Sequence, residues 1–86
     1  MKIGKRIFRL RKSKNLTQTF IANYFGKTPQ WLSNIERGTR SISTQELAKM
    51  ANILEVEPSI FFARNFNKAL KEHNYNIVPD KTSAAQ

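Results

Sequence analysis

Amide and hydroxyl side chains recur at helical spacing between residues 29 and 37. On a helix of 3.6 residues per turn, one arc of roughly 140° holds Pro29, Gln30, Ser33, Asn34 and Arg37. A Gln or Asn amide can form paired hydrogen bonds with N6 and N7 of adenine in the major groove of DNA, and a Ser hydroxyl can donate or accept. We therefore take Gln30 and Asn34 as the candidate base-reading residues.

The segment that carries these side chains has the pattern of an amphipathic helix. Leu32 and Ile35 point to the side opposite the amides. Thr28 followed by Pro29 is a strong start signal, because a capping hydroxyl precedes a ring whose fixed φ suits the first helical turn. Gly38 is a typical residue after a helix end. The pattern predicts a helix that runs to about Arg37.

A second short helix precedes this one. Thr17 can act as its N-cap, and Gly26 closes it. Only a tight turn at Gly26 and Lys27 separates the two helices. Two short helices joined in this way, over about residues 17–37, have the length of a helix-turn-helix.

The first expected helix is both amphipathic and basic. Ile3, Ile7 and Leu10 form its apolar stripe. Its basic residues gather on the other side, where we expect a solvated surface: Lys2, Lys5, Arg6, Arg9 and Lys12. Arg11 departs from them and points to the margin of the apolar stripe, where a charge requires a partner.

Two further helices complete an all-α fold of five helices. Ser43 and Glu46 form a capping-box pattern at the start of the fourth helix. Pro58 opens an extended last helix, in which Phe62, Phe66 and Leu70 align. We expect one helix-turn-helix domain over residues 1–72 and a flexible tail over residues 73–86.

Composition argues against an enzyme. The chain has no cysteine and a single histidine, His73, and its six carboxylates have no catalytic arrangement. We therefore expect no catalytic residues, no metal and no other cofactor. No apolar run is long enough to cross a membrane, and none resembles a signal peptide, so we expect a cytoplasmic protein.

The net charge of +9 is unevenly distributed. Residues 1–43 carry ten Lys or Arg and only one acidic residue, Glu36, whereas residues 44–86 carry five residues of each sign. Neutralised phosphates release counterions, so a basic half of this kind suits a polyanion. Charge alone fits either a nucleic acid or an acidic membrane surface.

Several short motifs, taken together, resemble the Cro/XRE family of phage-repressor type helix-turn-helix DNA-binding proteins. They are Ile3-Gly4, Ile7, Leu10-Arg11, Leu16-Thr17-Gln18, Ala22, Gly26, Leu32-Ser33 and Ile35-Glu36-Arg37-Gly38, with last matches at Val56 and Phe62. The resemblance covers residues 3–62. It implies a transcriptional regulator of prokaryotic or phage type, whose third helix enters the major groove. We expect a repressor that reads a palindromic operator in double-stranded DNA as a homodimer.

The resemblance also implies roles for single residues. Those expected to face the bases are Pro29, Gln30, Ser33 and Asn34, and those expected to contact the DNA backbone are Gln18, Thr28, Arg37 and Arg40. Arg11 and Glu36 correspond to a structural ion pair of the family. The sequence departs from the family pattern at Pro29, where a polar side chain is common, and at Ile42, where proline is common. Trp31 either packs against the second helix or donates its indole N–H to a phosphate.

Apolar residues of the last two helices exceed what a small domain easily encloses. This excess favours a dimer interface formed by Ile53, Ile60, Phe61, Phe66 and Leu70. The alternative is that Phe61 or Phe66 covers Phe8 within the same chain.

A different class of function is also open at this point. The chain could be an antitoxin or anti-regulator that binds a protein partner through the C-terminal segment from Asn67 and autoregulates through its helix-turn-helix.

Overall fold

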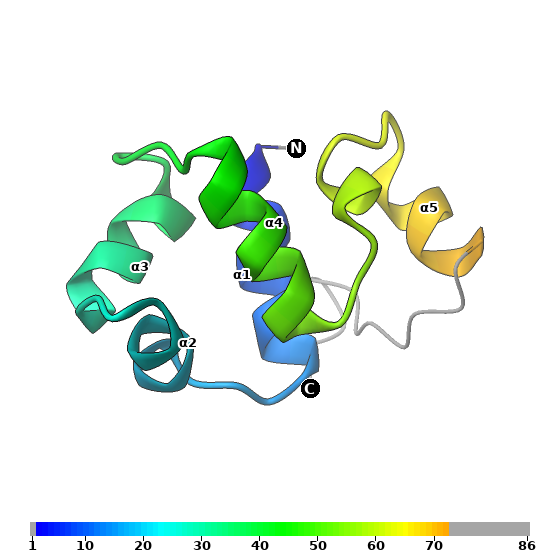
Figure 1. Ribbon diagram of the computed structural model, residues 1–86. Helices are drawn as coiled ribbons and strands as arrows, with labels where there is room; N and C mark the ends of the chain where they lie inside the picture. Colours follow the sequence, from blue (N-terminus) through cyan, green and yellow to red (C-terminus); the bar gives the residue numbers. More distant parts are fainter. Residues whose placement is uncertain (1, 73–86) are drawn as a thin grey trace, which may run out of the picture.

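The computed structural model describes residues 2–72 of the 86-residue chain (Figure 1). This part is helical and contains no strand. Its elements are α1 (Ile3–Ser13), α2 (Gln18–Phe25), α3 (Pro29–Arg37), α4 (Thr44–Leu54), the 3-10 helix η1 (Pro58–Phe61) and α5 (Phe66–Glu72). The predicted all-α fold is confirmed. The predicted tail over residues 73–86, including His73, lies outside the described residues.

Side-chain caps set the starts of α2, α3 and α4. The hydroxyls of Thr17, Thr28 and Ser43 each accept the backbone N–H of the third helical residue, over 3.0, 3.2 and 3.1 Å. Glu46 completes the predicted capping box by accepting the Ser43 backbone N–H at 3.0 Å. Each cap satisfies a helix-end donor that would otherwise lack a partner and contributes about 1 kcal/mol.

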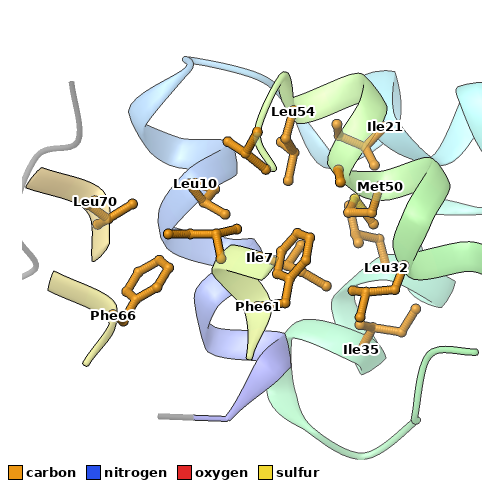
Figure 2. Close-up of a cluster of buried hydrophobic side chains, with 14 of the residues drawn as sticks. Ile7, Leu10, Ile21, Leu32, Ile35, Met50, Leu54, Phe61, Phe66 and Leu70 are labelled. Carbon is orange, nitrogen blue, oxygen red and sulfur yellow. The ribbon is translucent and has the colours of Figure 1, made fainter. Parts of the chain in front are cut away.

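Packing around α1 forms the centre of the core. α2 and α3 lie on one side of α1 and α4, and α5 lies on the other (Figure 1). Ile7 and Leu10 of α1 lie in the middle of the buried cluster, and Leu32 and Ile35 of α3 belong to the same cluster on the α2–α3 side (Figure 2). α1 and α3 approach closely at Gly4, where an added Cβ would overlap the Ile35 carbonyl oxygen.

The extended last helix is replaced by two shorter pieces. η1 ends at Phe61, and α5 starts at Phe66. Asn65 provides a reason for the new start, because its Oδ1 accepts the Lys68 backbone N–H at 3.0 Å, as an N-cap does. Phe62 therefore does not share a stripe with Phe66, and it is 66% exposed.

Arg6 and Arg9 of α1 are not part of a solvated stripe, so that prediction is wrong for them. They are only 5% and 6% exposed. The Arg6 Nη1 donates to the Ile60 carbonyl oxygen and the Arg9 Nη1 to the Asn67 Oδ1, both at 2.9 Å. Both guanidinium groups also lie over the Phe66 ring, 5.1 and 5.2 Å from its centroid. These contacts attach the C-terminal elements to α1, and burial lowers the pKa of Arg6.

The predicted dimer interface also needs correction. Ile60, Phe61, Phe66 and Leu70 are buried in the core of the chain itself, and Ile53 is partly buried against it. Side chains enclosed within one chain cannot at the same time form an exposed contact surface.

One aromatic residue of α1, Phe8, stays exposed. Phe8 keeps 39% of its surface exposed, and the Arg11 guanidinium lies 5.5 Å from its ring centroid. The Phe66 ring, which was one candidate to cover Phe8, packs against the guanidinium groups of Arg6 and Arg9.

No helix within residues 2–72 combines the length and the apolar character that crossing a membrane requires.

Candidate nucleic-acid interface

The outer face of α3 carries the residues that the sequence singled out. Leu32 and Ile35 are buried, which turns the opposite side of α3 to solvent. On that side Pro29 and Gln30 are exposed, and Ser33 and Asn34 are partly exposed. We call these four residues the α3 face.

Hydrogen bonds connect the polar side chains of the α3 face. The Gln30 Nε2 donates to the Asn34 Oδ1 at 3.2 Å. The Arg37 Nη1 donates to the Ser33 Oγ at 2.8 Å, and its Nη2 donates to the Asn34 Oδ1 at 2.6 Å. Sequence reasoning did not predict this network, although the spacings of three and four residues are those at which helical side chains meet.

Behind the α3 face, Glu36 joins three helices. Its Oε2 accepts the Arg11 Nε at 2.7 Å, and its Oε1 accepts the Arg11 Nη2 at 3.1 Å. The Gln18 Nε2 also donates to that Oε1, at 2.9 Å. The Arg11 and Glu36 side chains are only 8% and 4% exposed. A paired and hydrogen-bonded charge of this kind holds α3 in a fixed position against α1 and α2.

The four residues expected to contact the DNA backbone differ in exposure and in the hydrogen bonds that they already make. Thr28 is exposed, and its hydroxyl accepts the Trp31 N–H while its own O–H remains able to donate. Gln18 is the first residue of α2, and its side chain donates a hydrogen bond to Glu36. Arg40 is exposed in the loop between α3 and α4. Arg37, by contrast, has its guanidinium bound to two residues of the α3 face.

Near the start of α4, the surroundings of Glu46 favour its charged form. The Ser43 backbone N–H, which donates to this carboxylate, lowers the pKa of Glu46, and the positive charges of Lys27 and Arg40 lower it further. Lys27 of the helix-turn-helix turn and Arg40 therefore act on the same carboxylate.

Trp31 packs against α2, which is the first of the two alternatives that the sequence left open. It is 6% exposed, and its ring lies 4.9 Å from that of Phe25, centroid to centroid. Within residues 2–72 its buried Nε1 has no hydrogen-bond partner. Because this nitrogen is enclosed, the alternative contact with a phosphate does not fit the geometry.

Basic residues frame the α3 face on two sides. A hollow of about 520 Å³ between α1 and α3 is lined by Lys2, Gly4, Lys5, Phe8, Gln18, Ser33, Glu36, Arg37 and Gly38. A second hollow, of about 660 Å³, lies at the start of α2 and is lined by Arg11, Lys12, Asn15, Leu16, Thr17, Gln18, Thr19 and Pro29. Exposed Lys2, Lys5 and Lys12 therefore lie beside the α3 face, where their charge suits a polyanion.

Comparison with known proteins places this site in a family context. The family described as helix-turn-helix matches residues 7–61. An uncharacterized HTH-type transcriptional regulator, y4wC, of Sinorhizobium fredii is 31% identical over 83 residues, which is 91% of this chain and 58% of that protein. A second uncharacterized HTH-type transcriptional regulator of this organism, y4aM, is 32% identical over 60 residues, or 70% of this chain and 42% of that protein.

The chain thus spans about half the length of these two curated relatives. No solved structure matches it.

Proposed function

Because the chain belongs to the Cro/XRE type of helix-turn-helix regulators, we propose that it is a sequence-specific repressor that reads a palindromic operator as a homodimer. The observation that carries the proposal is the α3 face, where amide and hydroxyl groups stand in a row on a helix held rigidly by the Glu36 contacts. An α-helix fits the major groove of B-DNA, where base edges present distinct donors and acceptors.

In this proposal the α3 face supplies the base contacts. Gln30, Ser33 and Asn34 hydrogen-bond to base edges, and Pro29 offers only apolar contact, which suits a thymine methyl group. One good bidentate contact contributes on the order of 1–3 kcal/mol of discrimination against a wrong base. Base contacts from Gln30 and Asn34, repeated in two half-sites, add such discrimination several times over.

The same proposal assigns Gln18, Thr28 and Arg40 to the DNA backbone. Thr28 and Gln18 stand at the starts of α3 and α2, where helix dipoles and unpaired N–H groups favour a phosphate. Arg40 is an exposed cation beyond the end of α3. Such contacts position the protein but carry no sequence information, so an Arg40→Ala variant is expected to weaken binding to all duplexes alike and to reduce the salt slope by about 1.

A homodimer follows from the size of the reading surface. One α3 meets too few base pairs for useful selectivity, whereas two copies related by a two-fold axis read half-sites about 34 Å apart. Phe62, which is exposed, and Ile53, which is partly buried, remain as apolar surface for such a contact. A Phe62→Ser variant is expected to dissociate more readily than the wild type in analytical ultracentrifugation.

The test is selection of bound duplexes from a random DNA pool at about physiological salt, followed by sequencing. We expect enrichment of a two-fold symmetric site, and reduced expression of a reporter placed behind that site. If the folded wild-type protein enriches no sequence, the proposal fails.

A further inference from the structure

The free protein already uses part of the hydrogen-bonding capacity of the α3 face. The Asn34 Oδ1 accepts two hydrogen bonds, one from Arg37 and one from Gln30. A carbonyl oxygen has two lone pairs, so this oxygen is fully occupied.

The chemistry of arginine determines which way the Asn34 amide points. A guanidinium group has only donors, so the atom that it meets at 2.6 Å has to be the amide oxygen and not the amide nitrogen. The Asn34 Nδ2 is therefore the amide atom that points away from the Arg37 guanidinium. Asn34 can then offer solvent only the two hydrogens of this nitrogen.

Gln30 differs from Asn34 in what it leaves free. Its Nε2 gives one hydrogen to Asn34, while its Oε1 and the second Nε2 hydrogen have no partner within residues 2–72. One acceptor beside one donor is the pattern that complements N6 and N7 of adenine.

From this network we infer that Arg37 is a positioning residue that makes Asn34 a pure hydrogen-bond donor toward DNA. This inference rests on the proposed function and corrects the expected role of Arg37 as a backbone contact. The bidentate adenine contact considered for Asn34 is lost, because it requires a free amide oxygen. Gln30 retains that contact.

A donor-only Asn34 selects among the four bases. Guanine presents O6 and N7 as acceptors, and thymine presents O4, whereas cytosine presents only an amino donor. Adenine presents one acceptor beside an amino donor. The base opposite Asn34 is therefore guanine or thymine, and cytosine is the base most strongly rejected.

The experiment is the random-pool selection carried out with the wild type and four variants of the 86-residue chain. The Asn34 position of the site is the one at which Asn34→Ala abolishes base preference. There the wild type is expected to favour guanine or thymine over cytosine by at least roughly fivefold, the lower end of the range for a good base contact.

Arg37→Lys distinguishes positioning from backbone binding. Lysine keeps the charge, but it lacks the fork that reaches Ser33 and Asn34 together. We expect the preference at the Asn34 position to fall below about twofold while the preference opposite Gln30 persists. The matched control is Arg64→Lys, which changes an exposed arginine between η1 and α5 that is not assigned to any DNA contact, and it is expected to leave both preferences unchanged.

Asn34→Asp supplies a second, independent readout. The aspartate keeps an oxygen for Arg37 but replaces the outward nitrogen with a second acceptor, so the preferred base is expected to become cytosine or adenine. Circular dichroism establishes that each variant is folded.

Three results would overturn the inference. They are wild-type selection of cytosine or adenine at the Asn34 position, an unchanged preference in Arg37→Lys, and an unchanged base in Asn34→Asp. Failure of the folded wild type to enrich any site would instead overturn the proposed function, and this inference with it.

Discussion

Replacing Glu36 by glutamine should destabilise the fold more than its single-atom change suggests. The carboxylate accepts two hydrogen bonds from Arg11 and one from Gln18. Glutamine removes the negative charge and turns an NH₂ group toward one of these donors. Arg11, whose side chain is 8% exposed, then remains as a buried charge without its counter-ion.

The expected cost follows from the burial of this pair. Breaking a buried ion pair by removing one partner costs about 3–5 kcal/mol. The lower end applies here, because the Arg11 Nη1 keeps its hydrogen bond to the Leu16 carbonyl oxygen at 2.8 Å. A loss of about 3 kcal/mol lowers the Tm of a domain of this size by roughly 12–24 °C.

Urea unfolding at pH 7 measures this cost directly. Trp31 is the only tryptophan and is buried against Phe25, so its fluorescence reports the opening of the α2–α3 contact. Glu72→Gln, at the exposed end of α5, is the matched control and is expected to change the free energy of unfolding by less than about 0.5 kcal/mol.

A double-mutant cycle separates the pair from the rest of the fold. Because Arg11→Met removes the charge that Glu36→Gln leaves unpaired, the double variant should lose at least about 1 kcal/mol less than the sum of the single variants. A Glu36→Gln cost below 1 kcal/mol, or strict additivity, would refute the reasoning that this buried pair holds α3 in place.

Three further substitutions test other contacts. Gly4→Ala places a Cβ against the Ile35 carbonyl oxygen and is expected to lower the free energy of unfolding by about 3 kcal/mol; wild-type urea stability would show that α1 and α3 separate easily. Phe66→Ala should cost about 3–5 kcal/mol and speed amide hydrogen exchange in α5, and unchanged exchange would mean that α5 does not depend on this ring. Glu46→Gln should lower the free energy of unfolding at neutral pH. The pKa of Glu46 is lower in the folded than in the unfolded chain, so the charged carboxylate stabilises the fold at pH values above the unfolded pKa. This stabilisation is lost as the pH falls through the folded pKa. Urea unfolding at a series of pH values should then show the difference from wild type closing in acid, and a difference independent of pH would contradict this cause.

Local hydrogen bonds explain why the helix starts could be predicted. Thr17, Thr28 and Ser43 cap helices through residues three positions away, so a short stretch of sequence contains both partners. The α3 face was predictable for a similar reason, since the burial of Leu32 determines which side of that helix meets solvent.

Contacts between distant segments explain what the sequence did not reveal. Arg6 and Arg9 lie off the apolar stripe of α1 and therefore look solvated, but residues more than fifty positions later cover them. The Phe66 ring packs against both guanidinium groups, so it is not available for a dimer contact. Only tertiary packing decides between these uses of an aromatic side chain.

The break before α5 was missed because the apolar spacing and the capping residue point to different helix starts. The spacing of Phe62, Phe66 and Leu70 favoured one long helix, whereas Asn65 carried a capping signal for a new start. The hydrogen-bond network of Arg37 was out of reach for another reason, because spacing indicates which side chains can meet but not which atoms they present.

The most direct test of the central claim is the affinity ratio between the selected operator and a scrambled duplex of the same length and composition. Competition binding at about physiological salt compares the wild type with the folded Gln30→Ala/Asn34→Ala variant. If the α3 face reads base edges, the ratio falls at least about thirtyfold in the variant, while affinity for the scrambled duplex stays within about twofold. An unchanged ratio in a folded variant would contradict the claim and place recognition elsewhere on the molecule.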